Sequence, residues 1–209
     1  MNCIPTTTHR DRIVRYTLLG SAVLTALLGA IVSSTADAAE AAPAAKSARP
    51  AAEQVARGKY LMSTSGCMDC HTPWKMGEKG PEPDLSRLYS GHPEQLQMPP
   101  APQLPEGPWL VVWGATNTAI AGPWGVSFTA NLTPDMETGL GRWTERDFIQ
   151  TIRSGRHKGR GREVLPPMPI MVYNNFTDRD LKAIYAYLRT IPPVRNRVPE
   201  PVAPTASAR

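Results

Sequence analysis

Two stretches in the C-terminal half of the chain pair a polar helix-start signal with apolar residues at helical spacing. Thr144 and Thr177 each stand three residues before an aspartate, a variant of the capping box that begins many helices. The second stretch continues with apolar residues at positions i, i+3, i+4 and i+7, namely Leu181, Ile184, Tyr185 and Leu188. These patterns predict helices over residues 145–154, ending at Gly155, and over residues 178–190, ending before two prolines.

A third helix is predicted over residues 52–64, with Val55, Tyr60 and Met62 as its apolar anchors. Gly58 lies inside this helix, where glycine costs about 1 kcal/mol relative to alanine. A physical reason to keep glycine there is the close approach of another helix. We therefore expect a helix crossing at this position.

Residues 75–135 have no clear apolar period and are rich in proline and tryptophan. Because such tryptophan content is not typical of disorder, we predict an ordered, irregular chain that covers another part of the protein or meets a partner. The best strand candidate in the segment is the run WLVVWG, residues 109–114.

The two ends of the chain differ in composition from its middle. Residues 1–38 combine a basic start, an apolar run and a small-residue exit, which together describe a secretory signal peptide. The alternative is an uncleaved anchor that holds the protein at a membrane, since the apolar run is close to the minimum for a bilayer span. We predict an Ala/Pro linker over residues 39–52, a folded domain over residues 53–194 and a Pro-rich disordered tail over residues 195–209.

The charge balance argues against one large class of functions. The chain carries a net charge of +5, and residues 1–38 contain three basic and two acidic residues, so their removal would leave +4. The charges are scattered, without a basic stripe interleaved with aromatic residues, and we predict no nucleic-acid partner. Mild positive charge would make contact with an acidic protein partner sensitive to salt.

The candidate chemistry lies in residues 65–74, SGCMDCHTPW. Removal of Cys3 with the signal peptide would leave Cys67 and Cys70 as the only thiols, followed at once by His71. A thioredoxin-type pair would follow a strand in a βαβ unit, and a zinc site would need further ligands that the isolated His92 and His157 do not supply. Covalent haem is the favoured interpretation: two thiols bond the haem vinyl groups, and the adjacent histidine binds the iron. Export supports it, because this attachment takes place outside the cytoplasm.

The iron of such a haem either takes a sixth ligand or keeps an open position. Met168 stands in LPPMPIM, where three prolines forbid a helix and stiffen the loop. A stiff loop lowers the entropic cost of holding a weak thioether donor near the iron. We therefore favour Met168, with Met171 as the alternative. Ligation by histidine and methionine raises the reduction potential and leaves no position for a substrate, which is typical of electron transfer.

These motifs carry a family resemblance. The runs VARGKYLMSTSGCMDCH, PPMP and LKAIYAYL resemble those of a class I c-type cytochrome. The longer run over residues 128–194 is similar to the cytochrome c subunits and domains that accompany periplasmic dehydrogenases for alcohols, aldehydes or nicotinate. The similarity covers residues 53–194. It implies an all-α, class I cytochrome c-like fold, with a few helices around one covalently bound haem c and the Pro/Trp-rich segment as an irregular addition.

The resemblance also implies the ligands of the iron and the bonds to the haem. These are thioether bonds at Cys67 and Cys70, a proximal ligand at His71 and a distal ligand at Met168. The carbonyl of Pro81 or Pro83 would accept the N–H of the proximal imidazole and orient its ring.

Further residues follow from the same resemblance. Gly58 would mark the place where the first helix crosses the last, beside Tyr187. The haem propionates would pair with Asn131, Arg142 and Trp143, whose side chains can donate hydrogen bonds to a carboxylate.

The implied function is electron transfer. Chains of this kind often carry three haem motifs, whereas this one has a single Cys-x-x-Cys-His. It would be a one-haem carrier and not an enzyme, taking electrons from a periplasmic dehydrogenase and passing them to a terminal oxidase or another cytochrome of a respiratory chain. The alternative is a haem enzyme or gas-binding cytochrome with an open sixth position.

Overall fold

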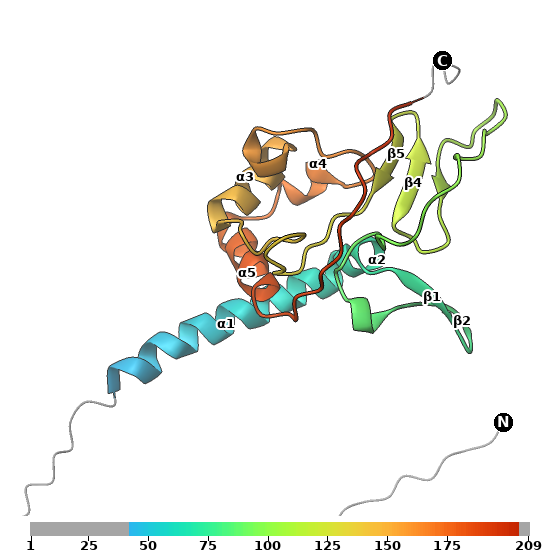
Figure 1. The fold of residues 1–209 in the computed structure, drawn as a ribbon. Coiled ribbons are helices and arrows are strands. Elements are labelled where there is room, and N and C mark those ends of the chain that lie inside the picture. The colour runs from blue at the N-terminus through green and yellow to red at the C-terminus, as the bar shows by residue number, and fades with distance from the viewer. Residues whose placement is uncertain (1–41, 205–209) are drawn as a thin grey trace, which may run out of the picture. The chain divides into compact units, whose positions relative to one another are not determined.

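Helices and small antiparallel sheets follow one another along residues 42–204, the part of the chain that the computed structural model describes (Figure 1). These residues belong to one compact unit, Glu40–Arg209. The predicted signal peptide or anchor over residues 1–38 lies outside the described residues. In order, the elements are α1 (Ala42–Thr64), α2 (Cys67–His71), β1 (Trp74–Gly77), β2 (Gly80–Pro83), η1 (Leu85–Arg87), β3 (Val112–Trp113), β4 (Ala119–Gly122), β5 (Gly125–Phe128), α3 (Glu145–Ser154), η2 (His157–Gly159), α4 (Ile170–Tyr173) and α5 (Asp178–Leu188).

The two capped helices are confirmed. The hydroxyl of Thr144 accepts the N–H of Asp147 and the carboxylate of Asp147 accepts the N–H of Thr144, so α3 begins with a complete capping box. Gly155 ends this helix with a φ of 64°, as a C-terminal glycine commonly does. Thr177 caps α5, which ends at Leu188, two residues before the predicted end.

The first helix differs from its prediction in two ways. It begins at Ala42, within the residues 39–52 for which an Ala/Pro linker was predicted. From residue 51 onward, where its side chains are described, the buried apolar ones are Leu61, 6% exposed, and Met62, 2% exposed, whereas Tyr60 is 58% exposed. The reason is the helical register, since Leu61 and Met62 lie three and four residues after Gly58 and share its buried face.

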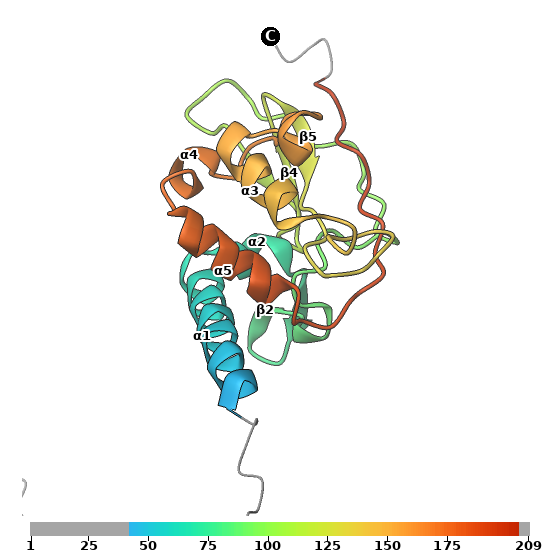
Figure 2. The same cartoon turned by 90° about the vertical axis from the view of Figure 1, so that its left-hand side faces the viewer.

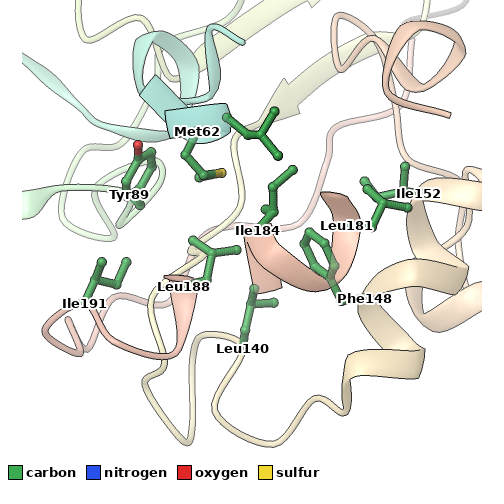
Figure 3. Close-up of a cluster of buried hydrophobic side chains, with 10 residues drawn as sticks. Met62, Tyr89, Leu140, Phe148, Ile152, Leu181, Ile184, Leu188 and Ile191 are labelled. Atoms are coloured by element: carbon green, nitrogen blue, oxygen red, sulfur yellow. The ribbon is translucent and has the colours of Figure 1, made fainter. Parts of the chain in front are cut away.

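Helices α1 and α5 cross at Gly58, as predicted. A β-carbon at Gly58 would overlap the carbonyl oxygen of Ala183 and lie 2.8 Å from the β-carbon of Tyr187. The crossing begins a core that α3 and the loops complete (Figure 3). Its buried members are Leu61, Met62, Tyr89, Leu140, Phe148, Ile152, Leu181, Ile184, Leu188 and Ile191.

The all-α prediction is incomplete, because residues 75–135 are not irregular throughout. β1 pairs with β2 as an antiparallel hairpin, and β3, β4 and β5 form a second antiparallel sheet in that order. Gly80 and Gly125, with φ of 118° and 92°, begin the second strands of the two hairpins, β2 and β5. The run WLVVWG does contain a short strand, β3, although its Trp109 is 76% exposed.

The C-terminal segment also differs from its prediction. Residues 195–204 were expected to be a disordered tail, but they continue from α5 along the protein to the edge of β5 (Figures 1 and 2). Asn196 is fully buried, and Val202 forms a two-way backbone bridge with Val126. We call residues 194–202 the C-terminal strap. Among the helices of residues 42–204, none has the length and apolar character that a bilayer crossing needs.

Candidate functional site

The Cys-x-x-Cys-His motif forms the short helix α2, which follows α1 after a sharp turn. Gly66 makes this turn with a φ of 72°, a conformation that glycine adopts without strain. Cys67 and Cys70 are half-buried free thiols, and His71 is only 8% exposed. One turn of helix therefore brings two sulfurs and an imidazole to the same place.

The imidazole of His71 has one defined partner. Its Nδ1 lies 2.8 Å from the carbonyl oxygen of Ala130. Because a carbonyl oxygen only accepts, Nδ1 carries the hydrogen and Nε2 keeps the lone pair that a metal ion binds. The prediction that Pro81 or Pro83 supplies this carbonyl was wrong, since both prolines belong to β2 and face β1 in the hairpin.

Residues 89–92 hold the acceptor carbonyl in place. The N–H of Leu132 donates to Tyr89, and the N–H of His92 donates to Thr129, at 2.9 and 3.0 Å. Between these two bonds, Gly91 has a φ of 76°, and a β-carbon there would lie 2.6 Å from the carbonyl carbon of Ala130. The close approach at Gly91 thus fixes the position of the carbonyl that His71 uses.

A cavity of about 750 Å³ lies against α2. Its wall includes Cys67, Cys70, His71 and Met168, together with apolar side chains of the core. The volume falls in the upper part of the range of about 300–1,000 Å³ that is usual for ligand and cofactor sites. The structure therefore places all four residues that were predicted to hold a haem around one large, mainly apolar space.

The two candidate methionines lie in different surroundings. Met168 is half-buried and belongs to the cavity wall. Met171 is 88% exposed on α4 and does not. The hydroxyl of Ser127 donates to the carbonyl of Pro166 at 2.7 Å, which ties the proline loop to β5. The structure thus brings Met168, and not Met171, to the same cavity as His71.

Tyr173 connects the methionine loop with the cysteine turn, a contact that the sequence did not indicate. Its hydroxyl donates to the carbonyl of Ser65, just before α2, and its ring stacks on Phe176 at 5.7 Å. Burial raises the pKa of Tyr173, so the phenol stays neutral and keeps its donor hydrogen. The side chain lies in the cavity wall, where it links the two walls that carry the predicted ligands.

The three residues predicted to meet haem propionates are not equivalent. Trp143 lines the cavity, with the ring of His157 edge-on at 4.7 Å. Asn131 also lines it, but its amide donates to the carbonyl of Val194 at 2.8 Å and accepts the hydroxyl of Thr133 at 2.7 Å. Arg142 is exposed and lies outside the cavity wall. The structure thus gives Asn131 a role in holding the C-terminal strap.

Two arginines in the cavity wall were missed by the sequence analysis. Arg162 follows η2, and Arg197 belongs to the C-terminal strap. Neither stands in a recognisable motif, and the strap had been predicted to be disordered. Only the folded arrangement indicates that these two segments reach the cavity.

The pKa values of the two thiols help to judge whether the motif is instead a redox-active dithiol. Burial raises the pKa of Cys67 to about 11 and also raises the pKa of Cys70. Redox-active Cys-x-x-Cys motifs depend on a lowered thiol pKa, so the shift is in the opposite direction. Among the residues that the structure describes, no three His, Cys, Asp or Glu side chains gather as a metal-holding group. The direction of the two pKa shifts disfavours a redox-active dithiol module.

Comparison with known proteins points in the same direction. The chain is 29% identical over 173 residues to the fructose dehydrogenase cytochrome subunit of Gluconobacter japonicus, a match over 83% of this chain. It is 28% identical over 149 residues, or 70% of this chain, to the cytochrome c subunit of the quinone alcohol dehydrogenase of Gluconobacter oxydans. These relatives are cytochrome subunits of dehydrogenases.

A third relative matches over a shorter stretch. A nicotinate dehydrogenase subunit of Pseudomonas putida is 39% identical over 85 residues, which is 41% of this chain. The chain spans only 28%, 24% and 7% of the fructose, alcohol and nicotinate dehydrogenase subunits, respectively. No protein-family model matches the chain.

Proposed function

We propose that the chain is a single-haem c-type cytochrome with a class I-like arrangement of helices around the cofactor. It would carry electrons from a periplasmic dehydrogenase to a downstream acceptor and would not itself be an enzyme. The observation that carries the proposal is the convergence of Cys67, Cys70, His71 and Met168 on one cavity of about 750 Å³. The similarity to dehydrogenase cytochrome subunits supports it independently.

The residues around the cavity fit a haem c. Cys67 and Cys70 would hold it through thioether bonds, and its bound iron would supply a one-electron couple. His71 would bind through Nε2, because Nδ1 donates to Ala130. Burial lowers the pKa of His71, which favours the neutral imidazole that a metal requires. The hydrogen bond to Ala130 fixes the ring and increases its strength as a ligand.

Met168 would hold the iron together with His71, from a loop that lines the same cavity. Its loop is held by the bond from Ser127 to Pro166 and by the N–H of Ile170, which donates to the carbonyl of Met168 at 2.9 Å. A haem held by both His71 and Met168 would supply one-electron exchange with partner proteins and would leave no position on the iron for a substrate.

The partners and the location are inferred from the relatives and from the N-terminal residues. Because the relatives are cytochrome subunits of dehydrogenases, we infer a dehydrogenase as the electron donor. Residues 1–38 would direct the chain to the periplasm. A terminal oxidase or another cytochrome would accept the electrons. Because the net charge is mildly positive, we expect electron exchange with an acidic partner to slow as ionic strength rises.

The deciding experiment measures the mass and the spectrum of the exported, purified protein. We expect one porphyrin mass on the polypeptide after denaturation, and a Cys67→Ser, Cys70→Ser double variant that lacks it. The native spectrum should be that of a low-spin haem with the sulfur-to-iron band of histidine–methionine ligation. Absence of added porphyrin mass would overturn the proposal. Covalent haem in a high-spin state that binds carbon monoxide rapidly would instead favour the gas-binding or enzymatic alternative.

A further inference from the structure

The C-terminal strap forms part of the cavity wall. Residues 197–201 all contribute to it, beside the segment that contains Ala130 and the loop that contains Trp143. Of the segments that line the cavity, the strap is the most C-terminal, and it was not part of the site predicted from the sequence. Its contribution shows that the cavity is completed by a segment without regular secondary structure.

The strap is attached at several points along its length. Asn196, fully buried, donates to the carbonyls of Ser90 and His92 at 2.7 and 2.8 Å. Its amide oxygen accepts hydrogen bonds from the guanidinium of Arg87 and from the N–H of Glu94, at 2.8 and 2.9 Å. All donor and acceptor groups of this amide are therefore engaged, and the strap is held in one position.

Further contacts flank this anchor. The N–H of Val194 donates to the hydroxyl of Thr133 at 3.1 Å, and Val202 makes its bridge with Val126 at the other end. A β-carbon at Gly125 would lie 2.8 Å from the carbonyl carbon of Ala203, so the chain just beyond the strap passes close to β5. Residues between these anchors have little freedom to leave the cavity wall.

Charged residues of both signs line this wall, and the strap contributes one of each, Arg197 and Glu200. Arg162 lies 3.6 Å from the carboxylate of Glu200, and Glu94 and Glu137 are also part of the wall. Arg197 engages Glu94 through its backbone N–H, at 2.7 Å, and not through its guanidinium. Among the described residues, no carboxylate lies within 4.0 Å of that guanidinium as an ion-pair partner.

We propose that the C-terminal strap belongs to the haem-binding site and that Arg197 pairs with a haem propionate. The inference rests on the proposed function. A haem bonded to Cys67 and Cys70 through its vinyl groups would carry its two propionates on the opposite edge of the ring, away from the thioether bonds. A carboxylate at the cavity wall is stabilised by a guanidinium, which can donate two parallel hydrogen bonds. Arg197 offers these donors without giving up another ion pair.

The pairing has a definite electrical consequence. Reduction adds one negative charge to the haem, and a nearby cation stabilises the more negative form. Arg197 would therefore raise the reduction potential. It would also lower the pKa of the propionate, because an adjacent positive charge favours the ionised carboxylate.

The test compares Arg197→Gln with Arg195→Gln in the haem-loaded protein. Both variants remove one positive charge from the same strap. Both arginines are exposed, but Arg195 lies outside the cavity wall, with Glu94 and Glu137 each at 3.7 Å. We expect the midpoint potential of Arg197→Gln to lie below those of the wild type and of Arg195→Gln. The pH at which its potential begins to change should move upward, as the propionate pKa rises.

A third variant, Arg197→Lys, separates charge from general disturbance of the strap. It retains the cation but loses the two-pronged donor, so its potential should recover toward that of the wild type. Equal potentials in Arg197→Gln and Arg195→Gln would overturn the inference, as would an Arg197→Lys potential as low as that of Arg197→Gln. Because each protein is first shown to carry covalent haem with methionine ligation, these outcomes leave the proposed function intact. Missing haem would overturn that function instead.

Discussion

Gly58 of α1 lies against the carbonyl group of Ala183 of α5, so closely that a β-carbon at position 58 would overlap the carbonyl oxygen. The distance between the two helices is therefore set by the absence of a side chain. α1 leads directly into the cysteine turn, and α5 contributes Leu181, Ile184 and Leu188 to the cavity wall. The crossing thus fixes two walls of the site relative to each other.

Replacement of Gly58 by alanine should destabilise the protein by about 2 kcal/mol or more, because overpacking a tight contact costs about 1–3 kcal/mol and here the obstacle is backbone. The loss should exceed the gain of about 1 kcal/mol in helix propensity. The measurement is the free energy of unfolding in urea. Gly107→Ala is the control, since its nearest heavy atom would be 3.9 Å away, and it should change stability little. Equal stabilities of the two variants would contradict the close crossing.

The proposed role of Met168 as an iron ligand can be tested with a pair of methionine variants. Met168→Ala should abolish the sulfur-to-iron band, lower the reduction potential and open the iron to cyanide, because the thioether is lost from the cavity wall. Met171→Ala should keep the native spectrum, since Met171 is 88% exposed on α4. The measurement is the absorption spectrum of the oxidised protein with and without cyanide. A native spectrum in Met168→Ala would assign the ligand to another residue.

Because His92 is buried as a neutral ring, we expect the stability of the folded protein to depend on pH. The side chain is fully buried, with Nε2 3.0 Å from the carbonyl of Leu96 and Nδ1 3.0 Å from the hydroxyl of Thr118. Nε2 therefore donates, Nδ1 accepts, and the neutral ring is fully bonded. Burial lowers the pKa of His92 below its ordinary value of about 6.5.

The stability of the folded protein should fall toward acidic pH, because unfolding lets His92 take up a proton. Below about pH 6.5 the unfolded chain binds a proton at His92 that the folded chain rejects, so this contribution is complete above pH 6.5 and is lost as the pH falls toward the lowered pKa. We expect the urea midpoint of the wild type to fall between pH 7.5 and 5.5 more steeply than that of His92→Gln. Parallel pH profiles for the two proteins would rule out the contribution.

The hydrogen bonds of the Asn196 side chain predict a large loss of stability when that side chain is removed. Asn196→Ala would leave four partners without their hydrogen bonds, the buried carbonyls of Ser90 and His92 and the half-buried donors of Arg87 and Glu94. Since each unsatisfied buried group costs about 1–3 kcal/mol, a total of about 3 kcal/mol or more is expected.

An exposed asparagine provides the comparison for Asn196. Asn175 also donates to two backbone carbonyls, but water can replace both bonds, and Asn175→Ala should cost about 1 kcal/mol or less. Thermal unfolding of the two variants measures the difference. If they unfold at the same temperature, the strap does not contribute to the folded domain in the way described.

The parts of the fold that the sequence predicted well depend on local signals. α3 and α5 begin at threonines whose capping partners stand three residues away, and Gly155 ends α3 within the same short range. The cysteine turn is local too, since its chemistry is contained in five residues, Cys67–His71. The helix crossing could be predicted from Gly58, because glycine destabilises a helix interior and is retained there for the close contact with α5.

The missed features depend on contacts between distant segments. Ala130 lies 59 residues from His71, and a backbone carbonyl has no side chain by which a sequence could mark it. The strands were missed because they are only two to four residues long, too short to establish an alternating pattern. The Pro-rich composition of residues 195–204 predicted disorder, although one buried side chain, that of Asn196, fastens them.

The place of the strap in the chain has a consequence for biogenesis. Cys67, Cys70, His71 and Met168 all precede Asn196, so during synthesis the thiols emerge well before the segment that completes the cavity. If the proposed haem c is attached at that stage, its porphyrin would reach the two sulfurs through an opening that the strap later closes. The order of synthesis along the chain would then separate insertion of the haem from closure of the cavity by the strap.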